Sequence, residues 1–413
     1  MRRFKGIILL AVTCLFLQGV TGQSAFINYT TADGLPDDNV MGVTVDFNGD
    51  KWFATQAGVA RLAGTTWTVW TTSNGLADNY IKCISVSTNG YIWAGTDVGV
   101  SVFNGTTWTN LNTTNGLVDN MVNCIYGTDN GDVWIGTTGG LSKYSGGTFT
   151  NYTTTSGLPS NMVSCIAESI FPTADLYFGT WMGGLVKYNG TTFTTINAAN
   201  NALPDDNITC LAIDSNGYKY VGTYFGLAKL NPQNQCIDTL LHVDGLLNEY
   251  IRDVRIAGIY GIWVGMFADY IQEGGISMMS NGNPAGVFTY TPAHGLVSVF
   301  VNCIAIDLNN DAWIATGSGV SKFSFNQLSV DAPEMPVSGA FFYPNPAKEQ
   351  LYLQLDGHSR GICRITDPAG RLMLAQEVGP EQQTLYTGNL KPGVYLVELT
   401  TNAHTSSGKL IIQ

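Results

Sequence analysis

The stretch GLADNYIKCISVSTNGYIWAGTDVGVSVFNGTTWTNL, residues 75–111, contains the unit that decides the fold. It holds four short segments rich in β-branched and aromatic residues, and none of them has helical periodicity. Asn89-Gly90 separates the first two segments and Asn104-Gly105 the last two, and both dipeptides favour hairpin turns because Asn and Gly tolerate positive φ. The unit therefore predicts four antiparallel strands, at 81–86, 92–96, 100–103 and 108–111.

This unit recurs along most of the chain. Its opening dipeptide, usually Gly-Leu, begins at Gly34, Gly75, Gly116, Gly157, Ala202, Gly245 and Gly295. An aromatic residue follows in each unit, at Trp52, Trp93, Trp134, Tyr177, Tyr220, Trp263 and Trp313. A single four-stranded sheet cannot bury both faces, so sheets repeated at this period must stack. We expect an all-β fold, a seven-bladed β-propeller over residues 23–326.

The ring is expected to close through the N-terminus. The segment from Phe26 to Tyr29 precedes the first unit and is similar to the fourth strand of the other units. The last unit has only a weak fourth strand after Phe323. The N-terminal segment is therefore predicted to complete the last blade.

The units resemble the two-component-regulator propeller repeat over about residues 26 to 325. The matching segments are Gly34-Leu35-Pro36-Asp37, Asp46-Phe47-Asn48-Gly49, Gly131-Asp132-Val133-Trp134-Ile135-Gly136-Thr137 and Gly140-Leu141. In that family the propeller is often the extracytoplasmic sensor of a membrane histidine kinase. This chain shows no kinase or receiver segment, so the resemblance does not extend to direct signalling.

The first 22 residues have the pattern of a secretory signal peptide, with Arg2, Arg3 and Lys5 before an apolar run from Ile7 to Val20. Cys14 in this run is the alternative acceptor of a lipoprotein anchor. No later stretch is long and apolar enough for a membrane-spanning helix.

The composition excludes some partners. A formal net charge of -12 with 19 basic residues argues against nucleic acid, which requires clustered Lys and Arg. We predict no cofactor and no metal. The turns Asp46–Gly49 and Asp214–Gly217 are similar to calcium loops but lack a later bidentate Glu.

Five cysteines occupy the same position on the innermost strand of their units, namely Cys83, Cys124, Cys165, Cys210 and Cys303. Equivalent positions on neighbouring blades are expected to lie beyond the reach of a disulfide, about 7 Å between Cα atoms. We expect buried free thiols that pack blade against blade. Cys236 and Cys363 are isolated.

A second domain follows a linker at 327–338. Residues 339–413 contain alternating segments separated by turn residues, which predicts a small Ig-like antiparallel β-sandwich. This domain resembles the type A C-terminal sorting domain of the type IX (Por) secretion system. The matching motif residues are Pro344, Asn345, Pro346, Asp367, Gly370, Arg371, Gly393, Tyr395 and Lys409. The resemblance implies the type IX secretion machinery as a partner, and a secreted or surface location on a Gram-negative bacterium.

The ligand site is expected on one face of the ring, where two loops of each blade emerge. The loop entering the innermost strand carries Asp38, Asn79, Asn120, Asn161, Asp206 and Glu249 at matched positions. These side chains form a ring of amides and carboxylates, or alternatively cap their own turns.

The loop between the second and third strands becomes aromatic in units four to six. It carries Trp181, Tyr224, Phe225, Phe267, Asp269 and Tyr270, and Tyr250 and Phe300 lie on the next entering loops. Aromatic faces beside carboxylates and amides suit sugar rings or a peptide. The alternative is that these loops pack on one another over the channel.

We therefore predict a recognition protein that binds a glycan or protein ligand. One rival is a lyase or glycosidase that uses Asp206, Glu249 and Asp269 as acid and base, which requires two carboxylates within about 5 to 10 Å. Another is an adhesion scaffold without a small ligand. His242 and His294 have no nucleophile at motif spacing, so a nucleophile-and-base site is not supported.

Overall fold

The computed structural model describes residues 26–169, 173–257, 261–268, 272–279, 287–324, 340–343, 347–355, 361–367, 371–379, 384–391, 393–401 and 405–412. Their regular structure is β-strand apart from single turns of helix. These turns are η1 (Thr72–Asn74), η2 (Thr113–Asn115), η3 (Thr154–Ser156), α1 (Ala198–Asn201), η4 (His242–Asp244) and η8 (Pro292–His294). Each turn precedes the loop that enters an innermost strand.

Residues 26–323 form seven four-stranded antiparallel sheets. The first three blades in chain order are β2–β5 (Val40–Val45, Lys51–Thr55, Gly58–Ala63, Thr66–Trp70), β6–β9 (Cys83–Val86, Ile92–Gly95, Val100–Phe103, Trp108–Leu111) and β10–β13 (Val122–Gly127, Val133–Thr137, Leu141–Ser145, Thr148–Tyr152). Blades four to six are β14–β17 (Val163–Ser169, Asp175–Thr180, Gly184–Tyr188, Phe193–Ile196), β18–β21 (Ile208–Ile213, Lys219–Thr223, Gly226–Leu230, Cys236–Leu240) and β22–β25 (Ile251–Ile256, Ile262–Met266, Gly275–Met279, Val287–Tyr290). Blade seven contains β26–β28 (Val301–Ile306, Ala312–Thr316, Gly319–Phe323) and β1 (Phe26–Tyr29).

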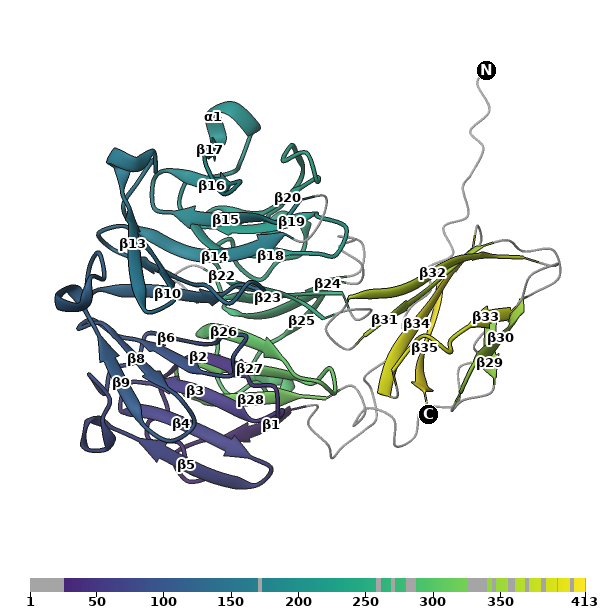
Figure 1. Ribbon diagram of the computed structural model, residues 1–413, viewed down its shortest axis with the longest axis horizontal. Helices are drawn as coiled ribbons and strands as arrows, with labels where there is room; N and C mark the ends of the chain where they lie inside the picture. The colour runs from purple at the N-terminus through teal and green to yellow at the C-terminus, as the bar shows by residue number, and fades with distance from the viewer. Residues whose placement is uncertain are drawn as a thin grey trace, which may run out of the picture.

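The blades form a closed ring. The innermost strands β2, β6, β10, β14, β18, β22 and β26 contact one another in this order, and β26 contacts β2. Figure 1 shows the chain passing through the blades from purple to green in sequence. The predicted all-β propeller is confirmed.

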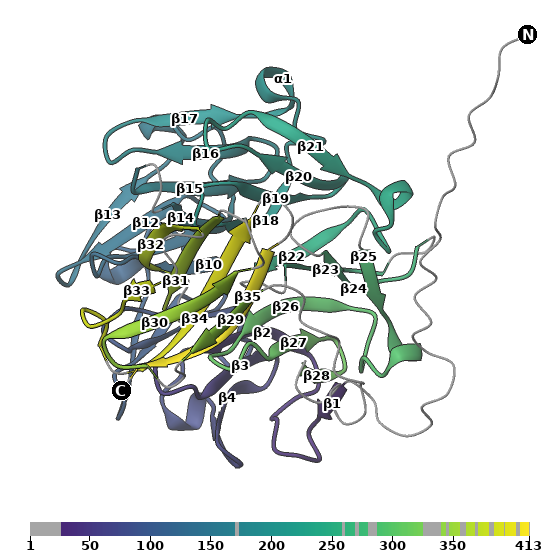
Figure 2. The ribbon, with the colours of Figure 1, turned by 90° about the vertical axis from the view of Figure 1, so that its right-hand side faces the viewer.

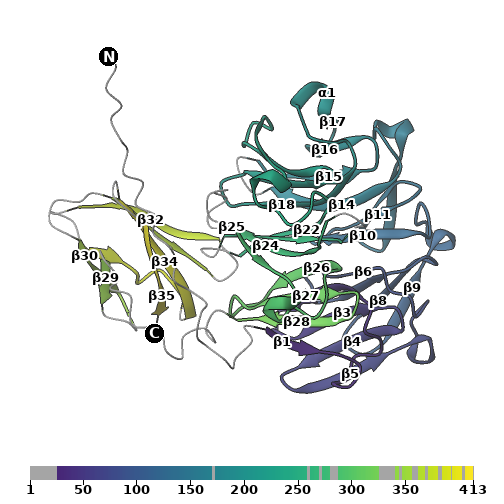
Figure 3. The same ribbon diagram turned by 180° about the vertical axis from the view of Figure 1, so that it is seen from behind.

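The N-terminal strand closes the ring, as predicted. β1 pairs antiparallel with β28, with Phe26 opposite Phe323 and Tyr29 opposite Val320, and the two strands lie side by side in Figures 1 and 3. Asn28 adds side-chain bonds across the same blade, because its Nδ2 donates to the carbonyl oxygen of Gly295 at 3.0 Å. The two ends of the propeller are thus held in one sheet.

The innermost cysteines explain the glycines opposite them. A Cβ atom added to Gly95, Gly136, Gly179 or Gly222 would collide with the Sγ atom of the cysteine paired with it. The thiols are free, as expected. Burial raises the pKa of Cys83 to about 12, so this thiol remains protonated and acts as an apolar packing group.

The C-terminal part consists of two antiparallel sheets (Figure 2). One contains β29 (Ala340–Tyr343), β30 (Gln350–Leu355) and β33 (Thr384–Tyr386). The other contains β31 (Gly361–Thr366), β32 (Leu372–Val378), β34 (Gly393–Thr401) and β35 (Thr405–Ile412). Leu351 from the first sheet and Ile365, Val397 and Leu410 from the second belong to one buried cluster, so the two sheets share a core.

Two of the predicted motifs in this part have a structural explanation. Arg371 donates through Nε to Asp367 Oδ2 at 2.8 Å and through its backbone N–H to Asp367 Oδ1 at 2.9 Å, which fixes the hairpin. The Tyr395 hydroxyl donates to the carbonyl oxygen of Lys391 at 2.8 Å. Gly393 begins β34, and Lys409 lies opposite Leu396 in the ladder. Pro344, Asn345, Pro346 and Gly370 lie outside the described residues.

Candidate binding face

The two predicted loops of each blade meet on one face of the ring, here called the top face. Backbone hydrogen bonds join them: Trp181 donates to the carbonyl oxygen of Met162 at 3.0 Å, and Phe267 donates to that of Tyr250 at 3.3 Å. The loop entering the innermost strand therefore lies beside the loop between the second and third strands. Side chains from both loops share this face.

Five aromatic side chains from four blades form a continuous row on the top face. We call Trp181, Tyr224, Tyr250, Phe267 and Phe300 the aromatic row. Successive ring centroids are 5.1, 4.4, 6.1 and 4.9 Å apart. These separations are those of interacting aromatic pairs, worth about 0.5–1.5 kcal/mol each beyond area burial. The contacts between the rings therefore stabilise the positions of the five side chains.

The row also remains accessible. The exposed fractions are 38% for Trp181 and 40% for Phe300, and Phe225 beside the row is 59% exposed. Loop packing and ligand binding are thus compatible, because the rings contact one another and still remain partly exposed. Burial and the neighbouring Tyr250 hydroxyl, 3.4 Å away, raise the pKa of Tyr224, so the Tyr224 phenol remains neutral at physiological pH.

The turn that carries Trp181 has an unusual backbone. Met182 has φ of 58°, in the left-handed region that a non-glycine residue rarely adopts, and its side chain is 76% exposed. Its backbone N–H donates to Asn207 Oδ1 of the next blade at 3.1 Å. This interblade bond helps to hold the strained turn, and with it the position of Trp181.

A pocket of ≈ 400 Å³ lies at the end of the aromatic row, where blades six, seven and one meet. Its walls combine three rings with amides and one cation. It is lined by Asn39, Met41, Gln56, Tyr250, Arg252, Phe267, Phe300, Asn302 and Gly317. Sequence reasoning missed Arg252 and Asn302 because they occupy innermost strands, where we expected only packing residues.

The predicted ring of amides and carboxylates mainly caps its own turns. The Oδ1 atom of each residue except Glu249 accepts a backbone N–H from the preceding helical turn. The pairs are Asp38 with Thr31, Asn79 with Thr72, Asn120 with Thr113, Asn161 with Thr154 and Asp206 with Ala198, at 2.7 to 2.9 Å. We therefore assign Asp206 a structural role, whereas Glu249 shows no such side-chain bond in the described structure.

Asp269 and Tyr270 lie outside the described residues. The lyase or glycosidase alternative therefore depends on Glu249 and a carboxylate that is not described. The two propeller histidines have structural partners, since His242 Nδ1 lies 2.7 Å from the carbonyl oxygen of Leu246 and His294 Nδ1 accepts from the Thr291 backbone at 3.2 Å.

Blade six differs from the others inside the channel. Asp253 occupies the position of the cysteines, and its Oδ2 atom accepts the Ile304 backbone N–H at 2.7 Å. Arg255 donates through Nε to the Ile304 carbonyl oxygen at 2.8 Å and lies 3.2 Å from Asp253 Oδ2. The nearby Asp253 carboxylate raises the pKa of Arg255, so its guanidinium stays charged. The bonds of both side chains to Ile304 join blades six and seven.

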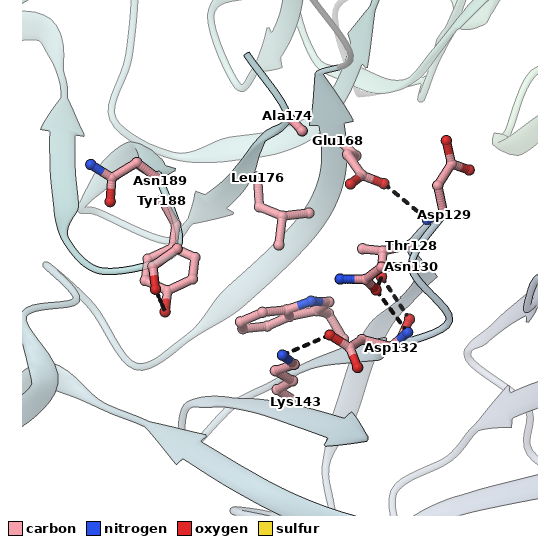
Figure 4. A pocket seen from close by; sticks show the side chains of 12 residues that line it. Thr128, Asp129, Asn130, Asp132, Lys143, Glu168, Ala174, Leu176, Tyr188 and Asn189 are labelled. Carbon is pink, nitrogen blue, oxygen red and sulfur yellow. Dashed lines mark hydrogen bonds and ion pairs between the residues drawn. The ribbon is translucent and has the colours of Figure 1, made fainter. Parts of the chain in front are cut away.

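A second pocket of ≈ 400 Å³ lies between blades three and four, at the hairpin that joins β10 to β11 (Figure 4). Its charged groups have partners within its own walls. Lys143 Nζ lies 2.6 Å from Asp132 Oδ2, and Glu168 Oε2 accepts the Asp129 backbone N–H at 3.3 Å. Burial raises the pKa of Glu168. We assign this pocket a structural role.

Neither a metal-binding group of three or more His, Cys, Asp or Glu side chains nor a helix able to span a membrane occurs in the part of the chain that the structure describes.

Two segments match known families. Residues 341–413 match the secretion system C-terminal sorting domain, and residues 116–139 match the two component regulator propeller. Both resemblances seen in the motifs are confirmed. The sorting domain indicates export through the type IX system to the cell surface, as the sequence predicted. No curated protein matches the sequence.

Solved structures share the fold at low sequence identity. The extracellular domain of the hybrid two component system BT3049 from B. thetaiotaomicron has a TM-score of 0.63 at 18% identity, over 95% of this chain and 58% of that chain. PorZ, a surface component of the type-IX secretion system of Porphyromonas gingivalis, has a TM-score of 0.59 at 17% identity, over 92% and 60%. Virginiamycin B lyase from Staphylococcus aureus has a TM-score of 0.55 at 13% identity, over 72% and 97%. The chain thus spans less than two thirds of the first two, and these likenesses establish the fold alone.

Proposed function

We propose that this chain is a surface or secreted recognition protein whose propeller binds a glycan or protein ligand at the top face of blades four to seven. The aromatic row is the observation that carries the proposal. It brings together side chains from five separate loops, yet its rings stay partly exposed. A fold that needed only to bury these rings would cover them.

The row suits an extended ligand. Ring faces give apolar contact area at little cost in side-chain entropy, and the amides of the adjoining pocket supply hydrogen bonds that fix orientation. The sorting domain supports a role outside the cell, because it brings the propeller to the surface where such ligands occur.

The test is binding of the intact chain to glycan and peptide arrays. A variant with Trp181→Ala, Tyr224→Ala and Phe267→Ala is expected to lose binding by about 100-fold, since central aromatic residues dominate such interfaces. The matched control carries Val98→Ala, Met121→Ala and Thr138→Ala on the top loops of blades two and three, and it should bind as the wild type does.

Circular dichroism and thermal unfolding establish that both variants are folded. Equal losses in the two variants would place the ligand elsewhere on the top face. An absence of any array binding by the folded wild type would favour the adhesion scaffold over recognition of a small ligand.

A further inference from the structure

The pocket at the end of the aromatic row contains a cation, Arg252, that has no protein partner among the described residues. Arg252 lies on β22, and its side chain is partly exposed in the wall of the pocket. Within the described part of the chain, its guanidinium makes no ion pair or hydrogen bond. The other basic side chain of this strand, Arg255, is engaged by Asp253 and Ile304.

The equivalent position has a structural task in blades three, four, five and seven, where its side chain donates to a backbone carbonyl oxygen of the next blade and so links neighbouring blades. These bonds are Asn123 to Val163, Ser164 to Ile208, Thr209 to Ile251 and Asn302 to Val40. The position is Met41 in blade one and Lys82, which bonds to the side chains of Asp97 and Asn123, in blade two. In the described structure Arg252 of blade six makes no such bond. Asp253 and Arg255 join blade six to blade seven instead, through Ile304. The guanidinium is therefore available to a ligand.

The neighbours of Arg252 define what that ligand resembles. A guanidinium presents a planar fork of donors that matches a carboxylate. Asn39, Gln56 and Asn302 offer amide donors and acceptors in the same wall, which suit hydroxyl groups, and Phe267 and Phe300 supply ring faces. A carboxylate, hydroxyl groups and an apolar face occur together in a uronic acid. A peptide carboxyl terminus would also use the guanidinium, and its backbone N–H and C=O groups can bond to the amides, so the binding test includes such peptides.

We propose that the pocket binds an acidic saccharide, with the carboxylate of a uronic acid on Arg252 and the following sugar rings along the aromatic row. This inference rests on the proposed function and names its ligand class. The chain has a formal net charge of -12, so general electrostatic attraction does not bring an anion to it. Recognition depends on the local guanidinium.

The test compares trisaccharides of galacturonate, glucuronate and mannuronate with their methyl esters in calorimetric titrations of the intact chain. At least one acid is expected to bind roughly 10- to 100-fold more tightly than its ester, since a hydrogen-bonded charge contributes about this much. Arg252→Gln should abolish the difference in affinity between acid and ester. Lys229→Gln on β20 removes the same charge outside the pocket and should preserve the difference.

Each other outcome contradicts or supports a defined part of the proposal. Equal binding of acids and esters, or an undiminished preference in Arg252→Gln, overturns the role of Arg252 but leaves the aromatic row intact. Binding of peptides with a free C-terminal carboxylate, without binding of any saccharide, overturns the saccharide class. Loss of all ligands in the Trp181, Tyr224 and Phe267 variant, with loss of the preference for acids in Arg252→Gln, supports both proposals separately.

Discussion

Blades two and five share a frame, by which we mean the packing of an inner cysteine on a glycine of the second strand, but they differ in their top loops. In both, an inner cysteine packs on a glycine of the second strand, Cys83 on Gly95 and Cys210 on Gly222. In blade two the top loop is polar, and Asp97 pairs with Lys82 at 3.0 Å. In blade five the same loop carries Tyr224, whose ring contacts Trp181 and Tyr250. Repeated positions thus build the ring, and the loops that differ between blades carry the residues to which we assign recognition in our proposal.

The largest effect is expected from breaking the shared frame. Gly136→Val introduces atoms where Cys124 Sγ and Val163 already lie, so it should lower the free energy of unfolding by about 3 kcal/mol or more. Gly222→Val in blade five should cost a similar amount. Chemical denaturation measures both. A small effect in only one blade would show that the frame is not shared.

A rescue experiment sharpens the same point. Blade one has Gly42 and Ala54 where blade three has Cys124 and Gly136. Gly136→Ala alone should therefore destabilise by about 2 kcal/mol, and adding Cys124→Gly should recover about 1 kcal/mol of this loss. A double variant less stable than the Gly136→Ala variant would contradict the prediction that blade three can adopt the residue pair of blade one.

Lys219 of blade five is a buried lysine that contacts Tyr177 of blade four. Its side chain is fully buried, with Nζ 5.0 Å from the centre of the Tyr177 ring and 3.1 Å from the Pro232 carbonyl oxygen. Burial lowers the pKa of Lys219 to about 8. Below pH 8 it is charged in both the folded and unfolded states, and folding carries the full cost of burying the charge. As the pH rises from 8 toward 10.5, the folded state releases its proton first and that cost disappears.

Lys219→Met should therefore be more stable than the wild type by about 1 kcal/mol at pH 7. The difference should shrink as the pH rises to 9.5, because the wild type gains stability and the variant has no such group. Thermal unfolding of both proteins at pH 7, 8 and 9.5 measures it. A pH-independent difference would show that burial of the charge is not its cause.

The smallest effect separates turn capping from recognition. Asn79→Ala removes the acceptor of the Thr72 backbone N–H, so it should cost about 0.5–1 kcal/mol of stability without changing ligand binding. Val98→Ala on the same face, 44% exposed, should cost less than about 0.5 kcal/mol. A loss of binding in Asn79→Ala would return this position to the ligand site.

The sequence was sufficient for the fold because its signals are local and repeated. The Gly-Leu dipeptides, the hairpin turns and the similarity of Phe26–Tyr29 to a fourth strand predicted the blades and their closure. The same local reasoning identified the aromatic residues of loops four to six, but it could not order them into a row. The row extends over 119 positions, from Trp181 to Phe300, and its contacts join residues up to 43 positions apart.

The pocket was beyond sequence reasoning for a related reason. It depends on blades six, seven and one, and on Arg252 having no partner among the described residues, where the equivalent side chains of four other blades bond to the next blade. The turn-capping role of Asp206 was also undecided, because the spacing of Asx residues is the same for a cap and for a ligand group.

The most direct test of the account is hydroxyl-radical footprinting of the intact chain, free and saturated with its strongest array ligand. We predict protection of Trp181, Phe267 and Phe300, whereas Met121 on the top loop of blade three and Leu308 in the hairpin that joins β26 to β27 remain equally reactive. Protection of Met121 or Leu308, with Trp181 and Phe300 unchanged, would contradict the assignment of recognition to the aromatic row.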